Sequence, residues 1–266
     1  MTDIERGQVA ASAADVYEEF FVPALFGQFA GRVCDAARLA PRERVVDVAC
    51  GTGVIARIAQ ERVGDGGVVI GVDLNEAMLT TAARVTPTVD WRRAPAEDLP
   101  LGDDSVDAAL SQFGLMFFED RHAALAELHR VVRPGGRVVV ATWCELSRSP
   151  GYAEMTELLR DELGDEAARS LEQPYVLGDP DEVTDLLRGA GLRDVEVREE
   201  PGTARFESLR AWLHTDIRGW TLAETVSDEV FDRLSAAARA RLAGFVGTGG
   251  EVEFDAPALL ATATAG

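Results

Sequence analysis

The sequence of 266 residues contains no lysine, and all 26 of its basic residues are arginine. Without lysine, the chain can form no lysine Schiff base with a carbonyl substrate or with pyridoxal phosphate, and it lacks the phosphate-binding lysine of a P-loop. Aspartate and glutamate together number 46, so the net charge is −20. Because nucleic acids and anionic membranes bind basic surfaces, this balance predicts no nucleic-acid partner and no membrane partner.

Cysteine and long apolar runs are also scarce. The three cysteines, Cys34, Cys50 and Cys144, are widely spaced and form no CxxC pair, so neither a disulfide framework nor a metal site is expected. No run approaches the ~18 apolar residues of a membrane span. The first residues are polar and lack the apolar core of a signal peptide, which predicts a cytoplasmic protein.

Hydrophobic residues make up 47% of the chain, which is enough for a sizeable core. In the first half, short apolar runs alternate with segments of helical periodicity. Strands are predicted at 44–49, 68–73, 89–93, 105–112 and 137–143, with helices at 53–63, 76–85 and 123–132 and a turn at 134–136. This alternation indicates βαβ units with right-handed crossovers, and therefore a parallel sheet covered on both faces.

The pattern changes on both sides of this region. We expect helices at 12–30 and 31–40, a break at Pro23, helical segments at 147–171, 181–190 and 208–245, a strand at 194–199 and a possible strand at 251–263. The prediction is one α/β domain over residues 1–266, with a Rossmann-like, doubly wound, mainly parallel seven-stranded sheet and helical lid insertions. Residues 44–143 would form a cofactor-binding core, residues 12–40 a lid, and residues 147–175 and 208–245 a substrate cap.

The most distinctive local feature is the segment Val-Val-Asp-Val-Ala-Cys-Gly-Thr-Gly at residues 45–53. Small residues at a strand-to-helix turn allow a ligand close to the backbone, and the N–H groups at the helix start favour a polar or anionic group. Asp73 follows twenty residues after Gly53, where an acid can accept hydrogen bonds from ribose hydroxyls. Residues 51–56 also fit the GxGxxA dinucleotide fingerprint, and ligand-free strand–helix packing would use the same small residues. The loop by itself leaves these alternatives open.

Further landmarks occur in a fixed order: Gly-Val-Asp-Leu-Asn-Glu-Ala-Met at 71–78, Ala-Pro-Ala-Glu-Asp-Leu-Pro-Leu at 94–101, Phe-Gly-Leu-Met-Phe-Phe at 113–118 and Arg-Val-Val-Arg-Pro-Gly-Gly at 130–136. Together with the glycine loop, this set resembles the class I S-adenosylmethionine-dependent methyltransferases. The resemblance is strongest to the bacterial small-molecule branch that includes ubiquinone/menaquinone methyltransferase-like proteins. It covers residues 15–145 closely, and it is specific for the cofactor but not for the methyl acceptor.

The resemblance implies S-adenosylmethionine as the cofactor and a set of residues that contact it. Asp47 would lie near the ammonium group, Asp73 would bind the ribose, and Tyr17 would close over the carboxylate end. The other implied cofactor contacts are Ala49, Cys50, Gly51, Gly53, Leu74, Met78, Ala96, Glu97, Ser111, Gln112 and Phe113. Two positions depart from the family pattern. Ala49 replaces the first glycine, which should cause only a slight shift, and Pro95 replaces a common acid, which leaves the adenine contact open.

For the methyl acceptor, the sequence indicates a class of molecule rather than an identity. Aromatic and aliphatic residues in the expected lid and cap favour a small apolar or aromatic metabolite. The candidate substrate contacts are Phe20, Phe21, Met116, Trp143 and Trp220. His214, in the expected cap, is the candidate general base, with simple packing as its alternative role. The accepting atom and the oligomeric state stay open. The rival functions are an NAD(P)-dependent oxidoreductase and a protein that binds the cofactor without transferring its methyl group.

Overall fold

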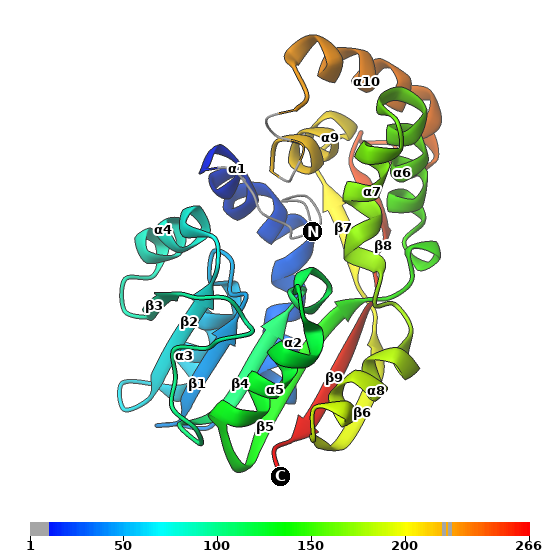
Figure 1. Cartoon of the computed structure of the whole chain (residues 1–266). Coiled ribbons are helices and arrows are strands. Elements are labelled where there is room, and N and C mark those ends of the chain that lie inside the picture. Colours follow the sequence, from blue (N-terminus) through cyan, green and yellow to red (C-terminus); the bar gives the residue numbers. More distant parts are fainter. Residues whose placement is uncertain (1–10, 220–221, 223–224) are drawn as a thin grey trace.

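The computed structural model describes residues 11–219, 222 and 225–266 (Figure 1). Seven strands form one sheet in the order β3-β2-β1-β4-β5-β9-β6. They are β1 (Arg44–Val48), β2 (Val68–Asp73), β3 (Asp90–Arg93), β4 (Val106–Gln112), β5 (Val132–Trp143), β6 (Arg193–Glu200) and β9 (Ala258–Thr264). Strands β1 to β5 pair in parallel, and β9 is antiparallel to both of its neighbours. The predicted mainly parallel seven-stranded sheet is therefore confirmed.

The strand order divides the helices between the two faces of the sheet. From β1 the chain runs outward to β2 and β3, then returns to β4 and continues to β5 on the other side. Right-handed crossovers in opposite directions place α3 (Val54–Val63) on one face, with α2 (Gly27–Ala36), and α5 (Arg121–Val131) on the other, with α8 (Pro180–Gly189) (Figure 1). α4 (Glu76–Val85) packs beside β2 and β3. The carboxyl ends of β1 and β4 thus form a topological switch point, where ligands bind in open α/β sheets.

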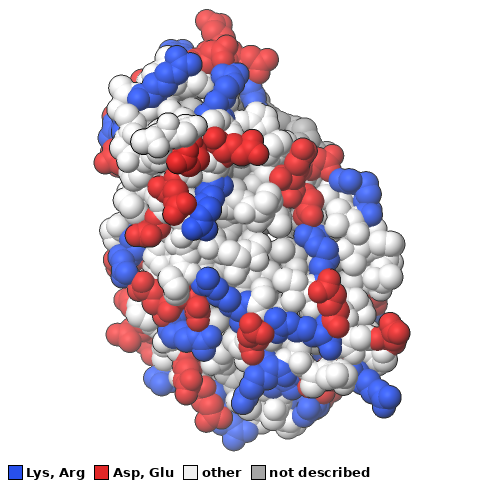
Figure 2. Space-filling view, turned by 180° about the vertical axis from the view of Figure 1, so that it is seen from behind, with Lys and Arg blue, Asp and Glu red and all other residues white. Residues whose placement is uncertain are grey.

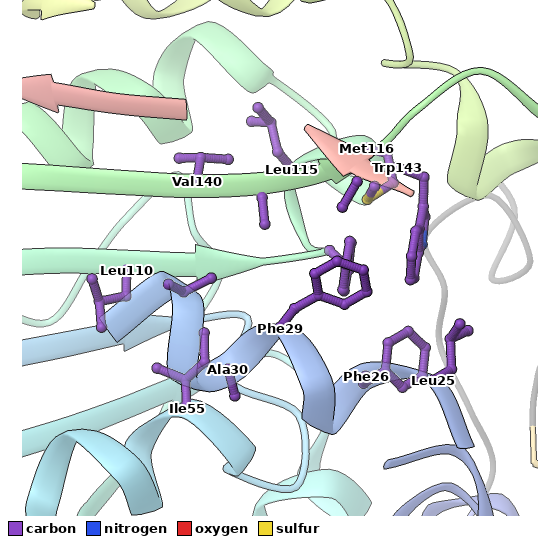
Figure 3. Close-up of a cluster of buried hydrophobic side chains, with 14 of the residues drawn as sticks. Leu25, Phe26, Phe29, Ala30, Ile55, Leu110, Leu115, Met116, Val140 and Trp143 are labelled. Carbon is purple, nitrogen blue, oxygen red and sulfur yellow. The ribbon is translucent and has the colours of Figure 1, made fainter. Parts of the chain in front are cut away.

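The apolar core covers both faces of the sheet, and one half of it lies between α2 and the central strands. Figure 3 shows Phe26 and Phe29 extending toward Trp143, which ends β5, while Ile55 and Leu110 pack deeper in the core. Phe29 and Trp143 meet edge to face with ring centroids 5.5 Å apart. The aromatic cluster therefore continues the apolar core toward the carboxyl end of the sheet.

The N-terminal segment differs from its prediction. No break occurs at Pro23: α1 (Ala11–Val16) continues as a π-helix, η1 (Tyr17–Phe26), which passes directly into α2. The N–H of Gly27 donates to the carbonyl of Val22, five residues back, as in a π-helix. Pro23 lacks only its own N–H donor, and the wider helix tolerates that loss. The predicted break is wrong, and the whole segment is one continuous helical arm.

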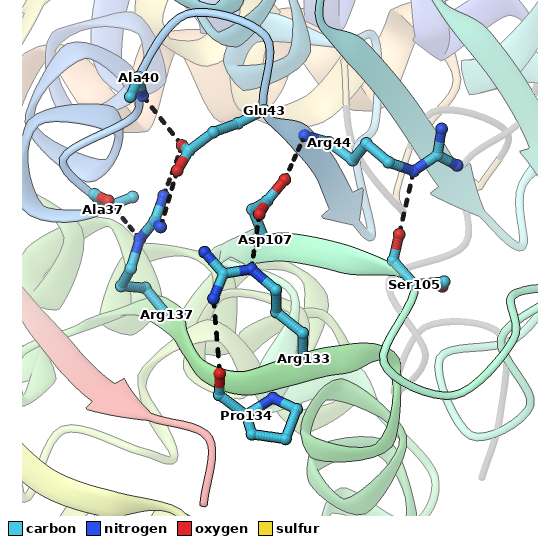
Figure 4. Close-up of polar contacts among 9 residues, drawn as sticks. All are labelled: Ala37, Ala40, Glu43, Arg44, Ser105, Asp107, Arg133, Pro134 and Arg137. Carbon is cyan, nitrogen blue, oxygen red and sulfur yellow. Dashed lines mark hydrogen bonds and ion pairs between the residues drawn. The ribbon is translucent and has the colours of Figure 1, made fainter.

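The predicted turn at 134–136 lies within the bounds of β5, which begins at Val132, but the chain bends there: Gly135 has a positive φ of 75°, and regular pairing with β4 starts at Arg137. The residues form an irregularity: Val132 pairs with Val106, whereas Arg137 pairs with Ala108. Figure 4 shows the polar contacts that surround this irregularity, at the amino end of the sheet and away from the switch point. Arg133 Nε donates to Asp107 Oδ1 at 2.7 Å, and Arg137 Nη1 donates to Glu43 Oε1 at 2.8 Å. The Arg-Pro-Gly-Gly motif therefore stabilises the amino end of the sheet, opposite the topological switch point.

A second, two-stranded sheet was not predicted. Its strands are β7 (Thr203–Phe206) and β8 (Val252–Asp255), and they pair antiparallel. β7 follows β6 and β8 precedes β9, so the pair continues the β6–β9 ladder beyond the main sheet (Figure 1). The predicted strand at 251–263 is thus two strands in two sheets. Four helices lie around this extension: α6 (Pro150–Leu163), α7 (Asp165–Glu172), α9 (Leu209–Arg218) and α10 (Asp228–Arg241).

Short helices complete the fold: η2 (Leu115–Phe117), η3 (Leu146–Arg148), η4 (Gln173–Tyr175) and η5 (Ala243–Phe245). On the face seen in Figure 2, arginine side chains are interspersed with aspartate and glutamate, so no single-sign surface covers that face. Among the helices of the described ranges, none combines the length and the apolar character needed to cross a bilayer. Within those same ranges, no cluster of three or more His, Cys, Asp or Glu side chains is arranged to bind a metal ion.

Candidate cofactor and acceptor sites

Two adjoining cavities lie at the carboxyl end of the sheet. The first cavity, of about 160 Å³, lies at the ends of β1, β2 and β4. The second cavity, of about 50 Å³, lies between Trp143 and the arm. Tyr17, Phe113 and Phe117 line both of them. These three aromatic side chains therefore form a shared wall at the topological switch point.

The first cavity brings together ten of the fourteen residues that the sequence suggested for the cofactor. They are Tyr17, Ala49, Gly51, Asp73, Leu74, Met78, Ala96, Glu97, Gln112 and Phe113. Pro95 lines the same cavity. The other four, Asp47, Cys50, Gly53 and Ser111, do not line it. Asp47 belongs to β1, Cys50 and Gly53 to the loop that follows it, and Ser111 to β4.

The loop between β1 and α3 has an unusual backbone. Ala49, Gly51 and Gly53 all have positive φ, at 56°, 54° and 87°. The left-handed region costs a non-glycine residue roughly 1–2 kcal/mol, so Ala49 is strained in place of the family's glycine. Gly53 faces Trp91: a Cβ there would lie 2.4 Å from the indole ring. Gly53 therefore permits close packing rather than contact with a ligand.

Asp73 holds the loop and faces the first cavity at the same time. Its Oδ2 accepts the N–H of Gly51 at 2.8 Å, and its Oδ1 accepts the N–H of Asn75 at 2.8 Å. Burial raises the pKa of the carboxyl, and these N–H donors oppose that rise. A carboxylate offers about four acceptor sites, so further donors can bind from the cavity side.

Asp47 lies one layer below the cavity. It is fully buried, and its Oδ2 accepts the N–H of Ala56 in the first turn of α3 at 3.1 Å. Burial raises the pKa of Asp47 to about 8. Asp47 does not line the cavity itself: its side chain points toward the helix, and its hydrogen bond ties β1 to α3.

Cys50 and Ser111 are buried behind the cavity wall. The Cys50 sulfur packs against Gly71, where an added Cβ would be 3.2 Å away, and burial raises the pKa of the thiol well above its usual range. Ser111 lies under Gly114, and its hydroxyl has no hydrogen-bond partner among the residues that the structure describes. Both side chains fill space in the wall.

At the opposite end of the first cavity, Glu97 links two loops. Its Oε1 accepts the N–H of Glu119 at 2.9 Å and the N–H of Asp120 at 3.2 Å.

Near the shared wall, Gln112 donates from Nε2 to the carbonyl of Phe26 at 3.2 Å. Its Oε1 is buried and has no hydrogen-bond partner within the described part of the chain. One acceptor oxygen is therefore left for a ligand.

The second cavity contains only part of the set suggested for the acceptor. Phe21 and Trp143 line it, whereas Met116 is fully buried in the core and lines neither cavity. Phe20 also lines neither, and its ring meets that of His214 edge to face at 5.6 Å. Trp220 lies outside the described residues.

His214 is not placed as the sequence suggested. It lines neither cavity, and its ring lies between those of Phe20 and Phe231. Burial, helped by Arg218 and Arg210, lowers its pKa. Histidine is a common general base, but the position of His214 on α9 turns its side chain away from the second cavity.

Three polar residues of the second cavity were missed: Tyr152, Tyr175 and Asp216. Asp216 is only 2% exposed. The sequence pattern offers one indication of Asp216: it lies four residues after Trp212 on a helix, so the two side chains share a face. An acid on an apolar helix face is unusual and points to a special environment.

Comparisons with known proteins agree with this geometry. Residues 46–140 match the family model described as "Methyltransferase domain". A demethylmenaquinone methyltransferase from Renibacterium salmoninarum is 34% identical over 181 residues, covering 64% of this chain and 75% of that protein. A 2-phytyl-1,4-naphtoquinone methyltransferase from Synechococcus elongatus is 40% identical over 106 residues, covering 38% of this chain and 46% of that protein.

One structural comparison covers almost the whole chain. It is a phosphoethanolamine N-methyltransferase 2 from Haemonchus contortus, solved with phosphomonomethylethanolamine and S-adenosylhomocysteine. The match has a TM-score of 0.63 and 18% identity, and it covers 98% of this chain and 58% of that one. At this identity it supports the shared fold alone. Together with the extent of the Renibacterium alignment, the matched domain establishes that the chain belongs to the class I S-adenosylmethionine-dependent methyltransferases.

Proposed function

We propose that the protein transfers the methyl group of S-adenosylmethionine, held in the first cavity, to an apolar aromatic small molecule held in the second. The observation that carries this proposal is the shared wall of Tyr17, Phe113 and Phe117. Methyl transfer requires the donor carbon and the accepting atom to meet in line at ~3–3.5 Å. Two cavities that differ in polarity and share a wall are suited to that requirement.

The residues of the first cavity fit the cofactor chemically. The carboxylate of Asp73 can accept hydrogen bonds from the ribose hydroxyls, and Leu74 with Met78 offers apolar surface to the adenine. The unpartnered Oε1 of Gln112 is an acceptor suited to the ammonium end. When bound, S-adenosylmethionine supplies an electrophilic methyl group on a sulfonium, and the protein supplies binding and alignment.

The arm and the helices around the second sheet are proposed to be the lid and the substrate cap, at 12–40, 147–175 and 208–245. At about 160 Å³, the first cavity is smaller than the ~300–1,000 Å³ of ordinary ligand pockets, so binding requires side chains to move apart. Tyr17 is the proposed moving element, because it stacks on Phe26 of the arm at 5.0 Å and lines both cavities. Closure would exclude water from the transferring group.

The acceptor is proposed to be a reduced naphthoquinone or a molecule of similar size and polarity. The second cavity is lined mainly by aromatic and aliphatic side chains, which favour a flat apolar ring, and at about 50 Å³ it too must widen to admit one. Two relatives are named as methyltransferases of naphthoquinone-type compounds. Either carbon or oxygen of such a ring could accept the methyl group.

The test is a methyl-transfer assay with isotopically labelled S-adenosylmethionine and 2-prenyl-1,4-dihydroxynaphthalene, with the product identified by mass spectrometry. We expect labelled product from this acceptor and none from a polar amine such as histamine. Calorimetry with S-adenosylhomocysteine and with NAD runs beside it. Binding of NAD but not of S-adenosylhomocysteine would overturn the cofactor assignment. Binding of S-adenosylhomocysteine without transfer to any aromatic acceptor would indicate a protein that keeps the cofactor for another purpose.

A further inference from the structure

Asp216 is a buried acid without a matching basic partner in the second cavity. Its Oδ2 is buried and makes no hydrogen bond to any described residue. Its Oδ1 lies 3.4 Å from the hydroxyl of Tyr152, which is at the long end of hydrogen-bond distances. Most buried polar atoms in folded proteins are paired, so an unpaired carboxyl oxygen in a cavity wall calls for a functional explanation.

Apart from the hydroxyl groups of Tyr17, Tyr152 and Tyr175, the described side chains that line the second cavity with Asp216 are aromatic or aliphatic. Among the described residues, no arginine lines the second cavity; Phe21, Leu25, Trp143 and Leu171 do. Burial raises the pKa of Asp216 well above its usual range, because an apolar environment disfavours the charged form. A neutral carboxyl has one O–H donor and one carbonyl acceptor, and it can pair with a hydroxyl group in both senses.

We propose that Asp216 recognises a hydroxyl group on the methyl acceptor, so that the second cavity selects a flat apolar ring bearing a phenol or enol hydroxyl. This inference rests on the proposed function and names the residue that recognises the acceptor's hydroxyl group. Asp216 is then the polar contact that orients an otherwise apolar molecule against the shared wall. Tyr152, behind the carboxyl, holds its other oxygen.

A purely structural role for Asp216 would run through its neighbours. Trp212, one helical turn earlier, interacts with the carboxyl through its indole N–H, and this polar contact, like that of Tyr152, lowers the raised pKa. However, the indole N–H of Trp212 makes no hydrogen bond of ordinary geometry within the described ranges. Trp212→Phe therefore serves as a matched control, because it removes the indole N–H through which a structural role of Asp216 would run.

The experiment measures ligand binding to the protein saturated with S-adenosylhomocysteine, so it does not depend on turnover. The probes are 1,4-dihydroxynaphthalene and naphthalene, which share the ring and differ in the hydroxyls. Wild type should bind the dihydroxy compound at least tenfold more tightly. Asp216→Leu should abolish that preference, Asp216→Asn should keep part of it, and Trp212→Phe should keep most of it. For Asp216→Leu, the S-adenosylhomocysteine affinity and the melting temperature should stay close to the wild-type values, because the change removes an unpaired buried acid.

The outcomes separate this inference from the proposed function. An unchanged preference in Asp216→Leu, or equal wild-type binding of the two probes, would overturn the inference. The same loss of preference in Trp212→Phe would assign Asp216 a structural role and overturn it too. A hydroxyl preference that depends on Asp216 without any methyl transfer would support the inference and overturn the proposed function. Methyl transfer to the aromatic acceptor that is unaffected by Asp216→Leu would support the proposed function and overturn the inference.

Discussion

The rings of Phe113 and Trp143 are stacked face to face, with centroids 3.7 Å apart and planes 4° from parallel. Phe113 directly follows β4, and Trp143 is the last residue of β5, the parallel neighbour of β4. Phe113 has a positive φ of 57°, which is strained for a bulky side chain. Such strain persists only where the surroundings enforce it, and stacking on Trp143 is one such constraint. The stack fixes the wall between the two cavities.

Two substitutions in this stack should have different consequences. Trp143 lines only the second cavity, whereas Phe113 lines both. Trp143→Leu should raise the acceptor KM at least tenfold and leave S-adenosylhomocysteine affinity within about twofold, while Phe113→Leu should weaken both. Each should lower the unfolding free energy by about 2–3 kcal/mol, through lost burial and a residual cavity. Equal loss of cofactor affinity in both variants would contradict a wall that separates two sites.

Asp73→Ala should weaken S-adenosylhomocysteine binding at least tenfold, because charge-assisted bonds to the ribose are lost. It should also lower stability by about 1–3 kcal/mol, since the N–H groups of Gly51 and Asn75 lose their acceptor. Calorimetry and urea denaturation check the two effects. Glu76→Ala is the control: it removes a nearby exposed acid that lies outside the cavity and should change affinity less than twofold.

Asp47 should make the stability of the ligand-free protein depend on pH. Its folded pKa of about 8 lies above the ~3.9 of an unfolded aspartate, so the folded state holds the proton more tightly. The associated stability is present below about pH 4 and is lost as the pH rises toward 8. Asp47→Asn keeps an acceptor for Ala56 and removes this titration. From about pH 5 to about pH 8.5, urea denaturation should therefore show wild type losing at least about 1 kcal/mol relative to the variant. Parallel pH profiles for the two proteins would refute this reading of Asp47.

Ala49→Gly should stabilise the protein by about 0.5–1 kcal/mol. Relief of the left-handed strain at Ala49 exceeds the entropic cost of a new glycine. Ala49→Val should destabilise it instead, because a β-branched residue tolerates positive φ poorly and Gly114 packs closely against the Ala49 methyl group. Thermal melts of the three proteins provide the comparison, and a valine variant as stable as wild type would count against strain at this loop.

His214→Ala should leave kcat and its pH profile unchanged, because His214 lines neither cavity. A stability loss of about 1 kcal/mol is expected from the lost contacts with Phe20 and Phe231. A fall in kcat of about 10²-fold, with loss of an acidic limb, would instead restore His214 as a general base.

The cap illustrates where reasoning from the sequence stops. Residue type favoured His214 over Asp216, since histidine is the usual general base near pH 7. The two are only two residues apart on α9, and helix geometry turns them to different sides. Which side faces a cavity depends on the packing of α9 against the arm and α10, which no local pattern encodes.

The sequence by itself determined the order of strands and helices over residues 44–143, the glycine loop with Asp73, and the family. These features are local: apolar periodicity, turn residues and short motifs are complete within a few residues. Only the tertiary structure decided that residues as distant as Tyr17, Trp143 and Asp216 line one cavity, that Asp47 faces α3, and that the C-terminal strand divides between two sheets. Those outcomes depend on which surfaces exclude water together, and burial is a property of the packed chain rather than of any segment of it.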